Sequence, residues 1–278
     1  MKSEIFIRIL MKGRKSNFMF SCILHINSYL MVGILFIIWD MLSIKNLSVS
    51  VGEKEILNQI SHNFELGKNY CILGKNGSWK SSLAMALMWN PKYEITSGEI
   101  TLDWESLTDL SPDKRAKLWI FLAFQNIPEI PWIKLFEFLK WVYDNAVKTT
   151  TFMEFKKIIE PILEELQLSK DFLWRDLNVG FSGGERRKLE ILQMKLLNPK
   201  YIILDEIDSW LDVDAFKVVA EMLKSLSTDD NSFIIITHIF TILDYLNADE
   251  TIVLENWKIV EAGWWEIAQR IKEKWFWK

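Results

Sequence analysis

The chain alternates between segments with the two-residue period of strands and segments with the 3.6-residue period of helices. Residues 42–51 are apolar at nearly every second position, which predicts a half-buried strand. Short, continuously apolar runs predict buried strands at 70–73, 119–124, 201–204 and 233–236. Further strands are expected at 56–66 and 98–103, and a hairpin over 250–262. Helical spacing covers 80–88, 213–226, 239–246 and 264–274.

This order of elements indicates an α/β fold with a parallel sheet that helices cover on both faces. Residues 134–176 depart from the alternation, because they have helical periodicity and no strand signal. We therefore expect an all-helical insert in that segment. No internal repeat or low-complexity linker interrupts the chain, and its 278 residues allow one large domain or two small ones.

Composition excludes several kinds of protein. Acidic and basic residues are interspersed with a net charge of −4, and no basic stripe or basic-aromatic cluster indicates nucleic-acid binding. The two cysteines, Cys22 and Cys71, are far apart and predict buried thiols rather than a metal site or a disulfide framework. The three histidines do not cluster either.

The segment after the strand at 70–73 resembles a phosphate-binding loop. It fits the pattern G-x-x-x-x-G-K-[ST] at every position but one, and reads Gly74-Lys75-Asn76-Gly77-Ser78-Trp79-Lys80-Ser81. A predicted strand precedes it and a predicted helix follows, which is the context that such a loop requires. Trp79 stands where the loop needs glycine, because the backbone N–H groups must approach the phosphates closely.

Tryptophan is in excess in this chain and glycine is scarce. The chain has 14 Trp and 11 Gly, whereas a domain of this size would carry about 20 glycines. Asp103-Trp104 and Asn256-Trp257 stand where hairpins favour Asp-Gly and Asn-Gly. Our hypothesis is that many of these tryptophans are UGA codons that the native organism reads as glycine. The alternative is a protein that is rich in surface tryptophan.

Two further segments carry candidate chemistry. The apolar strand at 201–204 ends in Asp205 and Glu206, whose carboxylates would point in different directions and so take different roles. Taken alone, the pair is equally compatible with a strand that ends in solvated acids. Within residues 180–185, the pair Gly183-Gly184 and the start of a helix are available to a phosphate. The alternative there is an N-cap serine with a capping acid.

Together these motifs resemble the ATPases of ATP-binding-cassette (ABC) systems. The match spans residues 42–277 and implies a P-loop ATPase head with a mixed, largely parallel sheet, an antiparallel β edge and a helical subdomain at about 134–185. The motifs occur in the family's order: the phosphate loop, Gln125, Ser182-Gly183-Gly184-Glu185, Asp205-Glu206, Ser209-Trp210-Leu211-Asp212 and Thr237-His238.

Within the family, the residues in and around these motifs are most similar to those of the SufC subfamily, the ATPases of iron–sulfur cluster assembly. The segments that carry this similarity are 121–125, 129–131, 178–185, 190–194 and 205–212. The resemblance implies glycine at the positions of Trp79, Trp132 and Trp210, and favours it at Trp104, Trp119 and Trp257. Many family members stack an aromatic side chain on adenine near residues 49–53, but this chain has none there.

The resemblance also implies roles for individual residues. ATP would be bound by Gly74, Lys75, Asn76, Gly77, Ser78, Trp79, Lys80, Ser81 and Ser82, and across a dimer of heads by Ser182, Gly183, Gly184 and Asp212. Mg²⁺ would be held by Ser81, Gln125 and Asp205. Glu206 would activate the attacking water, assisted by Gln125 and by His238 at the γ-phosphate. The implied partners are scaffold proteins like SufB and SufD.

The first forty residues form a separate segment. Lys12, Arg14 and Lys15 precede the apolar run 18–39, which resembles a membrane anchor interrupted by His25 and Asn27. An anchor in that orientation would place the domain outside the cell, away from ATP. We therefore expect residues 1–40 to be an upstream extension, with Met41 as the start of a cytoplasmic ATPase domain over 41–278.

Two other functions stay open on the sequence alone. The apolar run 18–39 favours the ATPase subunit of a membrane transporter. The residues of the segment Ser182-Gly183-Gly184-Glu185 and its surroundings favour the SufC subfamily instead. If the native protein has tryptophan at positions 79 and 210, the chain would be a nucleotide-binding module that does not hydrolyse ATP, because an indole would obstruct the phosphate loop.

Overall fold

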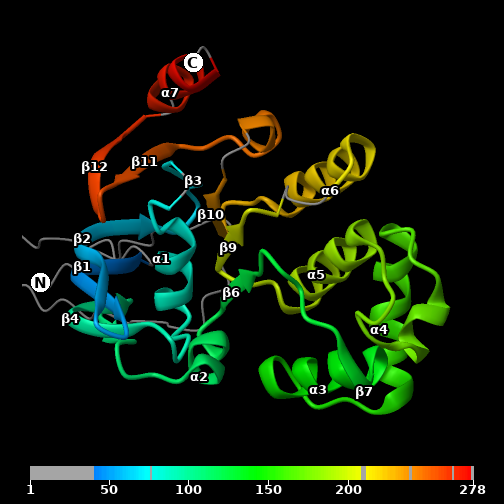
Figure 1. Ribbon diagram of the computed structural model, residues 1–278. Helices are drawn as coiled ribbons and strands as arrows, with labels where there is room; N and C mark the ends of the chain where they lie inside the picture. Colours follow the sequence, from blue (N-terminus) through cyan, green and yellow to red (C-terminus); the bar gives the residue numbers. More distant parts are fainter. Residues whose placement is uncertain (1–40, 76, 208–210, 238–239, 265, 277–278) are drawn as a thin grey trace, which may run out of the picture. The chain divides into compact units, whose positions relative to one another are not determined.

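The chain divides into two compact units, Met1–Ile38 and Trp39–Lys278. The computed structural model describes residues 41–75, 77–207, 211–237, 240–264 and 266–276, all in the second unit (Figure 1). The interpretations of residues 1–40 therefore lie outside the described residues. No helix in the described part of the chain is long and apolar enough to cross a bilayer.

A six-stranded sheet forms the centre of the unit, in the order β12-β11-β3-β10-β9-β6. Its strands are β3 (Tyr70–Leu73), β6 (Ile120–Ala123), β9 (Tyr201–Asp205), β10 (Ser232–Ile236), β11 (Glu250–Glu255) and β12 (Lys258–Gly263). Five of them run parallel, and β12 pairs antiparallel with β11. Every residue of β3, β9 and β10 is buried, because both faces of these strands are covered. The predicted parallel sheet is confirmed.

A second, antiparallel sheet has the order β2-β1-β4-β5. It consists of β1 (Met41–Val51), β2 (Lys54–Glu65), β4 (Glu94–Leu102) and β5 (Glu105–Ser106). The Tyr201 hydroxyl of the central sheet joins the two sheets, since it accepts from Leu42 N and donates to Phe64 O. The sequence prediction began β4 four residues too late and omitted β5, whose two residues are too few to show a period.

The helices are α1 (Lys80–Leu87), α2 (Pro112–Lys117), α3 (Leu135–Ala146), α4 (Phe152–Glu165), α5 (Gly183–Leu197), α6 (Val213–Leu226) and α7 (Glu266–Phe276). Short 3₁₀ helices are η1 (Lys170–Trp174) and η2 (Phe240–Asp244). The predicted helix at 239–246 is wrong in type, since its described part is only the 3₁₀ turn η2. Helix α2 was not predicted. It carries the fully buried Arg115, which donates to Ala86 O and Leu87 O and so caps the C-terminal end of α1.

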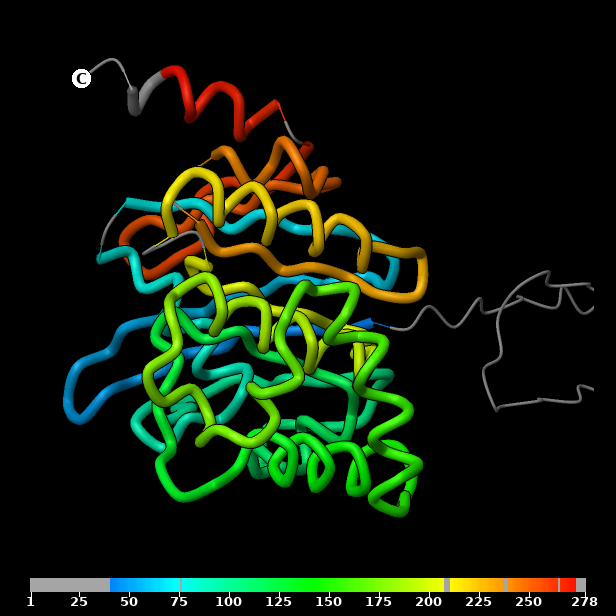
Figure 2. The backbone as a smooth tube through the Cα atoms, turned by 90° about the vertical axis from the view of Figure 1, so that its right-hand side faces the viewer, coloured from blue at the N-terminus to red at the C-terminus, as the bar shows by residue number. Residues whose placement is uncertain are grey.

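Helices α3, α4 and α5 gather on the side of the unit away from β1, β2 and β4 (Figure 1). Their apolar faces share one core, in which Phe136, Phe155 and Leu163 are buried. Figure 2 shows α7 at the opposite end from α3. The expectation of no strand in 134–176 is corrected at its edges, where β7 (Ile130–Lys134) pairs with β8 (Asp176–Leu177). The subdomain limits near 134 and 185 stay a prediction.

Six tryptophans of the described residues have left-handed backbones, with φ between 52° and 73°; they are Trp79, Trp89, Trp104, Trp119, Trp132 and Trp257. Asp103-Trp104 and Asn256-Trp257 have positive φ at both residues, as a type I′ hairpin turn requires. Trp89 and Trp119 follow the C-caps of α1 and α2, where helices commonly end on glycine. A bulky side chain strains such a backbone by about 1–2 kcal/mol, and glycine does not. The backbone at these six positions therefore favours glycine over tryptophan.

Candidate active site

The carboxyl ends of β3, β9 and β6, which lie within four adjacent parallel strands, bring the candidate residues to one edge of the central sheet. Across the sheet, Ile72 of β3 is level with Ile236 of β10, which is level with Asp205 of β9. Strand β6 lies on the other side of β9, with Ala123 opposite Leu204. The phosphate loop follows β3, Asp205 and Glu206 end β9, and Gln125 follows β6. The three motifs therefore converge although long stretches of sequence separate them.

The phosphate loop has the close backbone packing that its motif predicts. A Cβ at Gly74 would lie 2.3 Å from Ser78 Oγ and 2.5 Å from Leu254 O, so only glycine fits there. The buried Lys80 ammonium donates to Gly74 O at 2.7 Å and Lys75 O at 3.3 Å, and so folds back over the loop. Burial lowers the pKa of Lys80, and the carboxylates of Glu206 and Asp205 oppose this shift.

Trp79 is the N-cap of α1, with φ 68° and ψ 28° and no capping hydrogen bond from its side chain. Its half-buried indole packs against the core of the antiparallel sheet, with the Lys54 ammonium 4.8 Å from the ring centroid. Residue 79 thus has the backbone of a glycine, while its side chain fills space between the loop and β2.

Ser81 and Asp205 form a pair of oxygen ligands. Ser81 Oγ donates to Asp205 Oδ1 at 2.8 Å, and the side chain of Asp205 is fully buried. Among the described residues, Asp205 Oδ2 has no hydrogen-bond partner. A buried carboxylate oxygen without a partner beside a hydroxyl fits a hard cation such as Mg²⁺. The residues present therefore suit the metal that the sequence predicts.

Burial raises the pKa of Asp205 to about 6; the neighbouring Glu206 adds to the rise, while the Ser81 hydroxyl, Lys80 and Arg187 oppose it. The folded protein therefore holds this proton more tightly than the unfolded chain, whose aspartate has a pKa of 3.8. Folding stability from this group is greatest below pH 3.8 and falls as the pH rises towards 6.

Asp205→Asn is therefore expected to stabilise the metal-free protein at pH 8 by about 2–3 kcal/mol, because it removes a buried charge. The gain should disappear near pH 4, where the aspartate is already protonated. Urea unfolding at the two pH values measures this difference. Mg²⁺ should then stabilise the parent protein and not the Asp205→Asn variant. An equal response of both proteins to Mg²⁺ would argue against a metal site at Asp205.

Glu206 leaves β9 with a left-handed backbone (φ 48°), and its amide donates to Ile236 O at 2.9 Å. Its carboxylate Oε2 accepts from Gln125 Nε2 at 2.5 Å. Asp205 and Glu206 therefore take different directions, as the sequence predicts. Asp205 faces the phosphate-loop helix, and Glu206 faces the segment after β6.

The segment 182–185 forms the start of α5. Ser182 is the N-cap, and its hydroxyl accepts from Glu185 N at 3.3 Å, while Glu185 Oε2 accepts from Ser182 N at 2.7 Å. The capping box that the sequence offered as an alternative is thus present. Gly183 and Gly184 form the first turn of the helix, and a Cβ at Gly184 would be in ordinary contact, at 3.5 Å, with the Ala215 side chain of α6. Asp212 caps α6 through Ala215 N at 2.8 Å.

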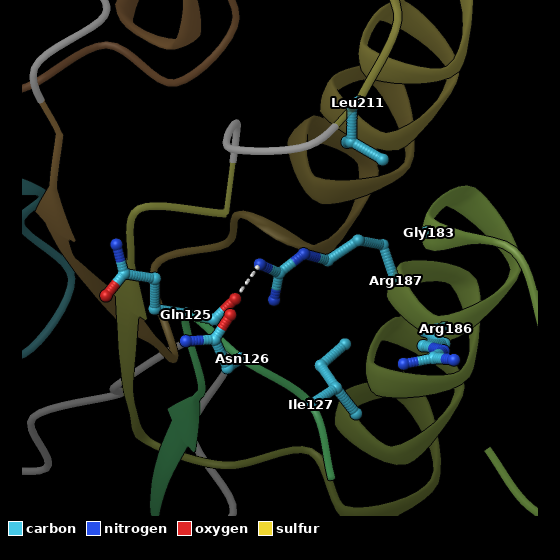
Figure 3. Close-up of a pocket in the computed structure, with 7 residues that line it drawn as sticks. All are labelled: Gln125, Asn126, Ile127, Gly183, Arg186, Arg187 and Leu211. Carbon is cyan, nitrogen blue, oxygen red and sulfur yellow. Dashed lines mark hydrogen bonds between the residues drawn. The ribbon is translucent and has the colours of Figure 1, made fainter. Parts of the chain in front are cut away.

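A cavity of about 300 Å³ lies between the segment after β6 and α5 (Figure 3). Its lining residues are Gln125, Asn126, Ile127, Gly183, Arg186, Arg187 and Leu211. Figure 3 shows the Arg187 side chain crossing from α5 to the backbone of Gln125. The structure thus joins Gln125 and Gly183 at one cavity, which the phosphate-loop residues do not line.

Three predicted elements of the site lie outside the described residues. These are Asn76, His238 and the segment 208–210 with Trp210. Within the described ranges, no group of three or more His, Cys, Asp or Glu side chains forms a metal cluster.

The sequence analysis assigned no role to Arg187 or Glu190, which are both buried on α5. Two charged residues three positions apart on a helix were the only available signal. It is a weak signal, because such pairs are usually solvated.

Comparison with known proteins decides the family. The family model described as ABC transporter matches residues 57–209, which is more than half of the chain. The chain belongs to the ABC transporter family. It is an ABC ATPase, as the resemblance implies.

Curated relatives of this ABC ATPase are matched over nearly their whole length. The chain is 42% identical over 240 residues to the "probable ATP-dependent transporter SufC" of Escherichia coli, covering 84% of this chain and 96% of that protein. It is 41% identical to the "probable ATP-dependent transporter ycf16" of Antithamnion sp., covering 84% and 95%.

Solved structures share the fold. The dimeric ABC transporter cassette MJ0796 matches with a TM-score of 0.69 and 22% identity, over 80% of this chain and 98% of that chain. A post-hydrolysis dimer of the same cassette, bound to ADP and phosphate, matches with a TM-score of 0.68. The ABC ATPase fold expected from the motifs is confirmed.

Proposed function

We propose that this ABC ATPase is the ATP-hydrolysing subunit of a SufBCD-like iron–sulfur cluster assembly complex in the cytoplasm. One observation carries the hydrolytic part: Ser81 and Asp205 are in contact, and Gln125 and Glu206 are in contact, at one edge of the sheet. The assembly role is supported by 42% identity to the SufC protein of Escherichia coli over 96% of that protein's length. The SufC-like residues of the motifs support it as well.

In this proposal each side chain has one task. Lys80, held beside the loop carbonyls of Gly74 and Lys75, neutralises phosphate charge when it turns to the nucleotide. Ser81 and Asp205, with Gln125, hold Mg²⁺, which supplies charge neutralisation on the phosphates when bound. Glu206 orients the attacking water and accepts its proton. Gln125 shares the Glu206 carboxylate with that water and so fixes its orientation, because the two groups are bonded to each other in this state.

The proposal needs a second head. Ser182, Gly183 and Asp212 lie exposed at helix N-termini, whose positive dipole end suits a phosphate from another molecule. We propose that two copies of the chain close around ATP, with these residues facing the loop of the opposite copy. The dimeric architecture of the similar MJ0796 cassette supports this arrangement.

The proposal also takes the residue at 79 of the native protein to be glycine. The left-handed φ of 68° at Trp79, and the five other left-handed tryptophans, support this assignment. Translation of UGA as glycine accounts for all six positions with one cause. It also accounts for the shortage of glycine relative to tryptophan in the written sequence.

One isolation from the native organism tests both parts. We expect an affinity-purified complex to contain scaffold proteins like SufB and SufD, and the intact mass of this subunit to be lower than the written sequence requires. Relative to the mass required by the start residue that the isolated protein has, Met1 or Met41, the deficit should equal a whole number of tryptophan-to-glycine exchanges. A membrane permease in place of the scaffold would support the transporter alternative. An unshifted mass would end the recoding hypothesis whichever partner appears.

A further inference from the structure

A buried ion pair on α5 holds the backbone that carries Gln125. The Arg187 guanidinium donates from Nη1 to Phe124 O at 2.6 Å and from Nη2 to Gln125 O at 3.1 Å. Glu190, one turn further along α5, accepts from Phe124 N at 3.1 Å through Oε1 and from Arg187 Nη1 at 2.7 Å through Oε2. Two side chains therefore bind three backbone groups of the Phe124–Gln125 segment.

The same segment leads directly to Glu206. The Gln125 side chain donates to the Glu206 carboxylate at 2.5 Å, so the contacts run from α5 through Arg187 and Gln125 to Glu206. At its N-terminal end, α5 begins with Gly183 after the cap Ser182. Arg187 lies about one turn after Gly183. The end of α5 that would meet the second head is therefore rigidly connected to the glutamate of its own head.

The pair suits this positioning task. Arg187 and Glu190 are 4% and 5% exposed, so their bonds are shielded from water. Breaking such a pair leaves an uncompensated buried charge, which makes the arrangement stiff. The planar guanidinium reaches two carbonyls and a carboxylate at once, which the single ammonium of lysine cannot reproduce.

We propose that Arg187 and Glu190 are positioning residues for hydrolysis, which hold the Phe124–Gln125 backbone so that the Gln125 amide meets Glu206. This inference rests on the proposed ATPase reaction. It adds a coupling between the start of α5 and Glu206 within one head. The alternative is that the ion pair only links α5 to the end of β6 and contributes to the stability of the fold, without any effect on catalysis.

The test uses Glu190→Gln and Arg187→Lys in full-length protein that carries Trp79→Gly and Trp210→Gly. We expect kcat for ATP to fall about tenfold or more in each, with KM unchanged, because a misplaced catalytic group affects the reaction more than binding. The matched control is Glu165→Gln, which breaks an exposed ion pair between α4 and Lys195 of α5 and should leave kcat unchanged.

A double-mutant cycle separates positioning from stability. In a Gln125→Ala background, Glu190→Gln should have no further effect on kcat, because the group that it positions is gone. If Glu190→Gln lowered kcat by the same factor in both backgrounds, the proposal would be overturned. An unchanged kcat in the protein that retains Gln125 would overturn it too.

Hydrogen exchange distinguishes failure of this inference from failure of the proposed function. Amides of residues 121–127 should exchange faster in Glu190→Gln than in the parent, and at the parental rate in Glu165→Gln, in the absence of nucleotide. If the parent does not hydrolyse ATP but this pattern is found, the ATPase proposal fails and the connection between α5 and Gln125 stands. Unchanged exchange in Glu190→Gln would refute the connection itself.

Discussion

Protein produced with Trp79→Gly and Trp210→Gly is expected to hydrolyse Mg·ATP at least about 100-fold faster than protein with tryptophan at both positions. That factor is the effect of restoring one preorganised backbone donor at a charged transition state. Residue 79 already has the left-handed backbone of the motif, so the exchange removes the indole and leaves the path of the loop intact. The backbone N–H groups can then approach the phosphates. Steady-state phosphate release by the purified proteins measures the ratio.

Two controls make this result specific. Trp104→Gly makes the same kind of exchange in the turn between β4 and β5, at a tryptophan that is 74% exposed, and should give no gain in activity. Adding Lys80→Ala to the doubly exchanged protein should abolish the activity and so exclude a contaminating ATPase. Equal hydrolysis with tryptophan and with glycine at position 79 would refute the interpretation of the loop and favour a binding module.

The second large effect is on stability, and its sign should follow the backbone dihedral. Replacing the three exposed left-handed tryptophans, Trp104, Trp132 and Trp257, by glycine is expected to stabilise the protein by about 1.5–3 kcal/mol, because these side chains give up little buried contact. Each exchange relieves about 1–2 kcal/mol of strain, and the greater freedom of glycine in the unfolded chain offsets about 0.5–1 kcal/mol. Urea unfolding of the single and combined variants measures the sum. Trp104 and Trp257 lie on separate hairpins, so their contributions should add.

Trp141 supplies the matched control. It is 67% exposed in the middle of α3, outside the set with positive φ, so it shares the exposure but not the strain. Trp141→Gly is expected to destabilise the protein by about 0.5 kcal/mol, because glycine is the poorer helix former. A loss of stability at Trp104 and Trp257 as well as at Trp141 would contradict the assignment of glycine to the left-handed positions.

Much of the site could be predicted because each motif is continuous in sequence. The loop from Gly74 to Ser81 is defined by glycine and lysine spacing within eight residues. The pair Asp205-Glu206 follows a strand whose apolar run already indicates burial on both faces. The convergence of these motifs followed only from the strand order of the structure, because parallel strands place their carboxyl ends at one edge.

Other features escaped prediction because their cause lies outside the local sequence. The pairing of β7 with β8 joins residues more than forty positions apart, and each strand is too short to have a period. Helix α2 covers six residues, and the buried Arg115 is explained only by the carbonyls of α1 that it caps. Trp89 could not be interpreted from its neighbours, whereas its φ of 52° after the end of α1 shows a backbone that favours glycine.

By itself, the sequence determined the family, the order of the elements and the identity of the phosphate loop and acid pair, because these depend on residue types at fixed spacings along the chain. The sequence also showed that tryptophan is in excess and glycine is scarce compared with an ordinary globular domain. The tertiary structure added Trp89 to the tryptophans whose backbone favours glycine, since φ depends on turns and caps. It also decided that Gln125 bonds Glu206, 81 residues away, while Arg187 holds Gln125, because packing alone brings such distant side chains together.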